Sequence, residues 1–160
     1  MQTTINVAQA FGLVGEMYDV TPRRVDAKEV ATAFTLGGVA GAKPADGSVG
    51  AMDSSTYTKF LGIFVRPKEA INYGATVSGS HEALAASLAQ PAGVTAQIVR
   101  MGRVNVLVPV GETWVANSDL YVTAAGALTN AAGESPSPNL KVGQIIVGGS
   151  AGEVACIQIG

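Results

Sequence analysis

Short runs that alternate apolar and polar residues, separated by glycine-rich turns, are the feature that most restricts the fold of this chain. The clearest run is VRMGRVNVLVPVG, residues 99–111. Successive side chains of a β-strand point to opposite faces, so a period of two predicts a strand here. Four valines of this run share one face of the predicted strand: Val104, Val106, Val108 and Val110.

Similar signals recur at roughly ten-residue spacing over the rest of the chain. Core strands are predicted at 29–38 and at 59–67, and hairpins at 119–130 and 141–160. No regular alternation with helices accompanies these strands. The sequence therefore predicts an all-β fold, a small barrel or sandwich.

The run KFLGIFVRP (59–67) also predicts which side chains share a face. Strict alternation places one set opposite the other: Leu61, Ile63 and Val65 against Phe60, Phe64 and Arg66.

One segment departs from the β pattern. SHEALAASLAQP (80–91) offers Ser80 as a helix N-cap, Leu84 and Leu88 four residues apart, and Pro91 beyond the end. A single short helix and a loop that carries helix-forming residues both fit. We therefore expect at most one short helix in the chain.

The first 28 residues follow neither a two-residue nor a 3.6-residue period. An extended arm that packs on another molecule would have this pattern, and so would an irregular strand lying across its own barrel. We divide the chain into an N-terminal arm, residues 1–28, and a β-barrel-like domain, residues 29–160.

Composition limits the classes of partner. Charged residues make up 14% of the chain, against roughly 25% in a typical soluble domain. Such a surface loses little ionic hydration on contact, which favours permanent burial against other proteins. The net charge is −2 and no Lys/Arg run exceeds two residues, so nucleic acid is not an expected partner.

Membrane association and export are not expected either. The longest uncharged stretch, 83–99, contains Pro91 and Gly93 and is shorter than a membrane span. The first charged residue is Glu16, so a secretory signal would lack its basic region. We expect a protein that is soluble where it is made.

Few residues could carry chemistry. The chain has one histidine and one cysteine, which excludes most nucleophile–base pairs and clustered zinc ligands. We expect His81 to be an exposed polar residue, Cys156 to be a small buried apolar residue, and Trp114 to fill the core or an interface. No catalytic residue, metal site or cofactor is predicted, and the chain is not expected to be an enzyme.

Several stretches in order along the chain resemble the capsid decoration proteins of tailed bacteriophages, often called structural cement proteins. They are PRRVD (22–26), GIFVRPKE (62–69) and the hairpin DLYVTAAGALT (119–129). The resemblance implies a β-barrel-like protein, made in the host cytoplasm, that sits on the exterior of the virion. There it would bind the major capsid protein, tie neighbouring capsomers together and help the head resist its packaged DNA. The helix-prone stretch 78–94 departs from the pattern.

With this resemblance, we expect residues 1–28 to act as a clamp on the shell, with the apolar side chains as buried anchors and the arginine pair binding carboxylate or carbonyl oxygens. The residues expected to bind the partner are Phe11, Val14, Met17, Tyr18, Val20, Pro22, Arg23, Arg24 and Asp26. Without the resemblance, the arginine pair beside a proline is typical of a solvated turn.

Two further expectations concern assembly and an alternative function. Ordering an arm costs entropy, which linked copies offset by making later contacts intramolecular, so we expect a closed homo-oligomer, a trimer rather than a dimer. The alternative function is recognition of host glycans by a surface β module, with Trp114 and Tyr121 as a stacking platform.

Overall fold

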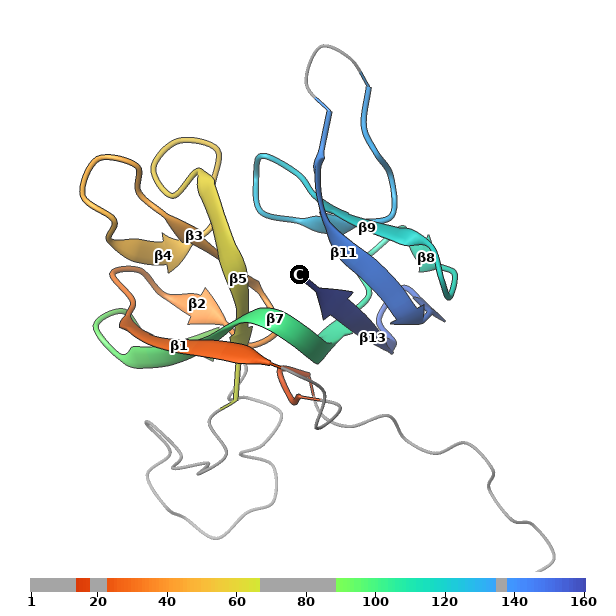
Figure 1. Ribbon diagram of the computed structural model, residues 1–160, viewed down its shortest axis with the longest axis horizontal. Coiled ribbons are helices and arrows are strands. Elements are labelled where there is room, and N and C mark those ends of the chain that lie inside the picture. The colour runs from red at the N-terminus through yellow and green to blue at the C-terminus, as the bar shows by residue number, and fades with distance from the viewer. Residues whose placement is uncertain (1–13, 18–22, 67–88, 135–137) are drawn as a thin grey trace, which may run out of the picture.

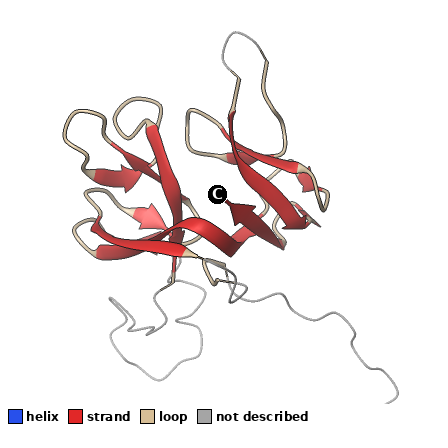
Figure 2. Ribbon diagram, in the orientation of Figure 1, coloured by secondary structure: helices blue, strands red, loops and turns tan. Residues whose placement is uncertain are grey.

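The computed structural model describes residues 14–17, 23–66, 89–134 and 138–160. Throughout these residues the regular secondary structure consists of strands joined by loops and turns (Figures 1 and 2). The all-β fold class is therefore confirmed. Within the same residues, no helix is long and apolar enough to cross a membrane.

The strands form one large sheet and two small ones. The large sheet has nine strands, in the order β10-β9-β11-β13-β7-β5-β3-β4, with β1 paired to β7 off this path. The pairs β12-β8 and β2-β6 form the small sheets. The strands are β1 (Arg24–Glu29), β2 (Phe34–Thr35), β3 (Val39–Ala42), β4 (Val49–Ala51), β5 (Lys59–Val65), β6 (Ala89–Gln90), β7 (Thr95–Leu107), β8 (Thr113–Trp114), β9 (Asp119–Val122), β10 (Leu128–Thr129), β11 (Leu140–Val147), β12 (Gly149–Ser150) and β13 (Val154–Ile159).

The long strand β7 joins two lobes of the molecule (Figure 1). Its first half is flanked by β1 and β5, which belong to the first lobe together with β2, β3, β4 and β6. Its second half pairs with β13 in the second lobe. The sheet curls around this shared strand as an open half-barrel.

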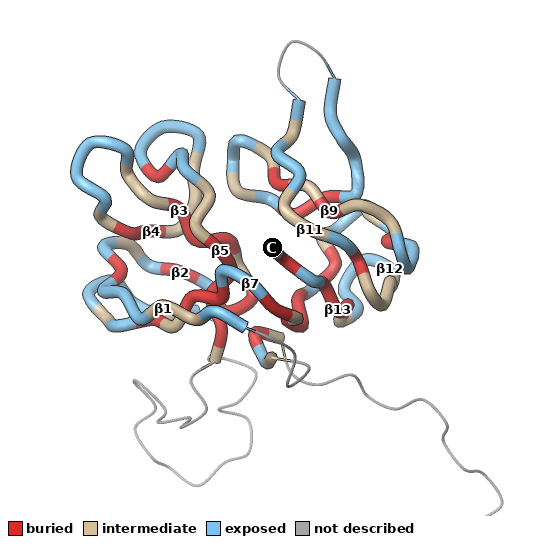
Figure 3. The backbone as a smooth tube through the Cα atoms, viewed as in Figure 1, coloured by how far each residue is buried: buried red, intermediate tan, exposed pale blue. Residues whose placement is uncertain are grey.

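The alternating valines along β7 and just after it lie in the larger of two apolar clusters. Figure 3 shows that β7 contains buried as well as more exposed residues. Val104, Val106 and Val108 are fully buried and pack with residues of both lobes. Val110 was expected on the same face but is 96% exposed, because β7 ends at Leu107 and a turn follows. The smaller cluster fills the first lobe, where the rings of Phe34 and Phe64 lie 4.3 Å apart between centroids.

The predicted strand at 59–67 is confirmed as β5, but the predicted division of its faces is wrong. Ala40 of β3 pairs with Gly62, whereas Gly41 pairs with Phe60, so Leu61 is an extra residue in a β-bulge. The bulge reverses the alternation. Leu61 consequently packs against the small cluster with Phe64, while Phe60 packs against the large one.

The predicted strand at 29–38 is mostly wrong. Glu29 ends β1, Phe34–Thr35 forms the two-residue strand β2, and a turn follows in which Gly37 has a φ of +78°. A left-handed residue in this position cannot continue a strand, so the chain reverses before β3. Both predicted hairpins are confirmed, as β9–β10 and β11–β13.

The segment predicted as a helix or loop falls mainly outside the described residues, which resume at Ala89. Its described end contains the short strand β6, in which Ala89 pairs with Thr35 and Gln90 with Phe34. These two residues are therefore extended rather than helical.

Candidate functional site

The described start of the chain lies against its own domain. The Gly15 amide donates a hydrogen bond of 2.8 Å to the Asn105 carbonyl, and the Asn105 amide donates one of 2.9 Å to the Glu16 carbonyl. Met17 forms an isolated antiparallel bridge with Val104. Residues 14–17 thus extend the sheet along the second half of β7.

Arg66, directly after β5, holds the same segment from a second side. Its main-chain amide donates to the Gly15 carbonyl at 2.8 Å, and its Nε donates to the Val14 carbonyl at 3.0 Å. Gly37 leaves room for this contact, because a Cβ on it would lie 2.5 Å from Val14 Cγ1. The segment is therefore fixed by three parts of the domain: β7, Arg66 and the turn before β3.

β1 continues in the same direction along β7. Glu29 pairs with Thr95 and Arg24 with Met101, while Met17 lies opposite Val104. Of the two interpretations of the first 28 residues, the described parts fit an irregular strand on its own sheet. Residues 1–13 and 18–22 lie outside the described residues, so an arm formed by them stays a prediction.

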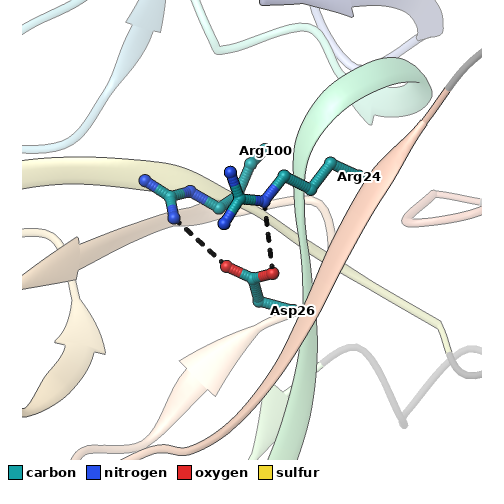
Figure 4. Close-up of polar contacts among 3 residues, drawn as sticks. All are labelled: Arg24, Asp26 and Arg100. Atoms are coloured by element: carbon teal, nitrogen blue, oxygen red, sulfur yellow. Dashed lines mark hydrogen bonds and ion pairs between the residues drawn. The ribbon is translucent and has the colours of Figure 1, made fainter.

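The pairing of β1 with β7 brings two arginines to one carboxylate. Arg24 pairs with Met101 and Val25 pairs with Val99, so Arg100 is the extra residue of the ladder. As Figure 4 shows, the side chains of Arg24 and Arg100 both point toward Asp26. Asp26 Oδ1 lies 3.6 Å from Arg24 Nε, and Asp26 Oδ2 lies 3.2 Å from Arg100 Nη1.

These three side chains line an open groove of about 590 Å³ in the first lobe, which we call the basic groove. Among the described residues, its lining is Arg24, Val25, Asp26, Ala27, Lys28, Ala42, Gly47, Val49, Leu61 and Arg100. The lining contains three cations and one carboxylate, which leaves a formal charge of +2. Arg24 is 65% exposed and Arg100 39%, so both guanidinium groups reach solvent.

A smaller apolar pocket, of about 210 Å³, lies beside the N-terminal segment. Val14 lines it together with Leu36, Leu107 and Leu128. Leu107 is 48% exposed, although it belongs to β7. Apolar surface is thus accessible next to the point at which the described chain begins.

The structure divides the sequence-predicted site residues into three groups. Arg24 and Asp26 meet in the basic groove, and Arg23 is exposed beside it. Val14 and Met17, in the described segment 14–17, are half-buried against the domain. Four residues of the predicted site lie outside the described residues: Phe11, Tyr18, Val20 and Pro22.

The solvated-turn interpretation of the arginine pair is wrong for Arg24, which is the first residue of β1. Arg100 was missed by the sequence analysis. It lies 74 positions from Asp26 in the sequence, and the pairing of β1 with β7 brings the two residues together. No local pattern around Arg100 signals that placement.

Trp114 and Cys156, which could have served other functions, are both buried. Trp114 is 2% exposed and its Nε1 donates to Glu112, so its ring is not available to stack on a sugar. Tyr121, the other residue of the glycan platform, is half-buried and its hydroxyl donates to Asp119. Cys156 is buried, as predicted, and His81 lies outside the described residues. Within the described ranges, no group of three or more acidic, histidine or cysteine residues is placed to hold a metal ion.

Two aspartates, the exposed Asp46 and the half-buried Asp53, close turns of the first lobe. The Ser48 hydroxyl and amide both donate to Asp46, which lowers the pKa of that carboxyl from 3.8 to about 2. Amides of Thr56 and Ser55 lower the pKa of Asp53 in the same way. These carboxylates stabilise local loops and lie outside the basic groove.

Comparison with known proteins identifies the family. A family model described as "Structural cement protein (E217 gp24/Pam3 gp6)" matches residues 1–160. No curated protein matches the chain in sequence. A solved structure entitled "The capsid of Myoviridae Phage XM1" contains a chain with the same fold, with a TM-score of 0.60 and 16% identity over 99% of this chain and 96% of that one. Since the family model spans every residue, the chain belongs to the structural cement proteins of bacteriophages.

Proposed function

We propose that this protein binds the outer surface of the major capsid shell and cements neighbouring capsomers, so that the DNA-filled head is stabilised. The observation that carries the proposal is the match of a phage cement family over the whole chain. The fold shared with a chain of a phage capsid structure supports it. A chain with only 14% charged residues suits a protein that stays bound.

In this proposal the N-terminal segment contacts the shell. The described part fixes the base of that segment on β7 and Arg66, so a pull on residues 1–13 would be transmitted to the large sheet. Phe11 remains a proposed anchor, as do Tyr18, Val20 and Pro22. Such apolar anchors usually dominate the affinity of an interface.

We also propose that the protein acts as a closed homo-oligomer, a trimer rather than a dimer. Copies joined in this way bind the shell at several points, and each later contact forms at a high effective concentration. The role is structural rather than enzymatic, in keeping with the family.

The test uses heads assembled without this protein. Purified full-length protein is added, and bound protein is measured by co-sedimentation together with the temperature at which packaged DNA is released. We expect saturable binding at a fixed ratio to the shell protein and a higher release temperature. Absence of binding at all protein concentrations would contradict the proposal.

A truncated variant tests the clamp. Removal of residues 1–13 leaves every described contact of Gly15 and Arg66 in place, whereas removal of 1–28 would also delete most of β1. The shorter deletion is expected to weaken co-sedimentation without changing the unfolding temperature. Unchanged binding would show that residues 1–13 are not the clamp.

A further inference from the structure

The lining of the basic groove has more cationic than carboxylate side chains. Asp26 contacts Arg24 through one oxygen and Arg100 through the other. Lys28 also lines the groove, is exposed, and has no ion pair among the described residues. Like charges held together in this way favour an additional anion, because it reduces their repulsion.

The two guanidinium groups retain most of their donors. Each guanidinium has five N–H groups in a planar fork, and Asp26 contacts one nitrogen of each side chain. The fork geometry matches a carboxylate, which can accept two parallel hydrogen bonds. Because Asp26 already orients both side chains, less conformational entropy is lost when a second carboxylate binds.

The spacing of the groove residues fits an extended peptide. Arg24, Asp26 and Lys28 occupy alternate positions of β1, so they face the same side at intervals of roughly 7 Å. The two cations therefore stand at the ends of this row and the carboxylate stands between them. Val49 and Leu61 supply apolar surface in the same groove.

We infer that the basic groove binds an extended acidic segment of the capsid shell protein, with carboxylates at two positions that flank an aliphatic residue on the same face. The carboxylates pair with Arg24 and Arg100 at one end and with Lys28 at the other. The aliphatic side chain lies opposite Asp26, where a third carboxylate would be repelled, and contacts Val49 or Leu61. This inference rests on the proposed function, since it names the chemistry of the surface to which the protein binds.

A nucleic acid fits the groove less well. Binding to DNA requires several phosphate contacts that together displace counterions, and this chain carries a net charge of −2. Asp26 within the groove would repel a continuous phosphate backbone. A short acidic peptide needs only a few contacts and can place its carboxylates on either side of Asp26.

The decisive variant is the double substitution Arg24→Gln and Arg100→Gln, tested on heads that lack the protein. The matched control is Arg103→Gln, an arginine of the same strand that pairs with Gln158 on the second lobe. We expect the double variant to bind at least about tenfold more weakly, since charge-assisted hydrogen bonds are lost. Its binding is also expected to depend less on salt, and the control is expected to bind like the wild type.

A second variant and a peptide probe test the same groove independently of the double variant. Lys28→Glu reverses one charge at an exposed position and is expected to weaken binding as well. A short capped peptide with two glutamates flanking one valine at alternate positions is expected to shift the amide resonances of β1 and to compete with heads. The same peptide with glutamines is expected to do neither.

The outcomes separate this inference from the proposed function. If the wild type binds heads but the double variant and Lys28→Glu bind equally well, the inference is overturned and the proposed function stands. If the wild type binds no heads, the proposed function fails. A third outcome is that duplex DNA binds the wild type, the double variant does not bind DNA, and the acidic peptide binds neither protein. In that case the groove is a phosphate site and the inference is wrong.

Discussion

The Nε of Arg66 donates a 3.0 Å hydrogen bond to the carbonyl of Val14, although the two residues are 52 positions apart. The main-chain amide of Arg66 also donates to the neighbouring Gly15 carbonyl. One residue thus fastens the described start of the chain to the end of β5. In the proposed clamp, this attachment would transmit force from the N-terminal segment to the sheet.

Substitution Arg66→Met is predicted to loosen that attachment. It retains the apolar stem but removes the charged donor, which typically costs about 1.5–3 kcal/mol for a charged hydrogen bond. We expect faster hydrogen exchange at the Gly15 and Asn105 amides than in the wild type. Lys59→Met, at an exposed cation of β5, serves as the control, and equal exchange in both variants would contradict the role of Arg66.

Gly37→Ala is predicted to expel the N-terminal segment from its position. Gly37 has a φ of +78°, and an added Cβ would lie 2.5 Å from Val14 Cγ1. Gly111→Ala is the matched control, because Gly111 has a φ of +85° but nothing within 4 Å of an added Cβ.

Both glycine variants should lose about 1 kcal/mol of unfolding free energy from the left-handed backbone alone. Only Gly37→Ala should lose more and expose residues 14–17 to protease. Equal losses measured by denaturant unfolding, with equal protection from protease, would show that Gly37 does not limit the packing of Val14.

The valine face of β7 allows a test of the core. Val106→Ala removes fully buried methyl groups and is expected to lower the unfolding free energy by about 2 kcal/mol. Val110→Ala, at a position 96% exposed, is expected to change it by less than about 0.5 kcal/mol. Chemical denaturation of the two variants checks the end of the strand, and similar losses would place Val110 in the core.

The Asp46 carboxyl provides a pH-dependent signal. Its pKa falls from 3.8 to about 2 because Ser48 donates two hydrogen bonds to it. A lowered pKa in the folded state means that Asp46 stabilises the fold above about pH 4, and that this stabilisation disappears as the pH falls toward 2. Acid should therefore weaken the β3–β4 turn.

Carbon-13 NMR titration of the carboxyl groups checks this prediction. In Ser48→Ala, which lacks the hydroxyl donor, the pKa of Asp46 is expected to rise toward 3.8. The pKa of Asp53 is held low by Thr56 and Ser55 and should not change. A titration of Asp46 that Ser48→Ala leaves unaltered would contradict the assignment.

Local patterns were sufficient to predict the parts of the fold that obey regular alternation. The valines of β7 and the glycine turns of the two hairpins have strong short-range signals, so β7, β9–β10 and β11–β13 were anticipated. The face on which Leu61 lies was not predicted, because a bulge shifts the side-chain alternation by one residue and no sequence pattern signals the bulge.

The candidate site could likewise be predicted only in part from local sequence patterns. Arg24 and Asp26 could be singled out as a local charge cluster, but the basic groove also needs Arg100, which the pairing of β7 with β1 places beside them. The N-terminal segment has no period of its own, and main-chain hydrogen bonds with Arg66 and Asn105 hold it in place. Such contacts are set by tertiary structure rather than by neighbouring residues.

Whether the protein is a permanent outer component of the capsid is tested most directly by its amount in purified, DNA-filled virions. Quantitative mass spectrometry with labelled standard peptides gives its ratio to the major shell protein, and labelling of intact particles reports its exposure. We predict one constant ratio across preparations and a protein that is labelled without opening the head. Absence from the particles, or a ratio that varies between preparations, would contradict a cementing role.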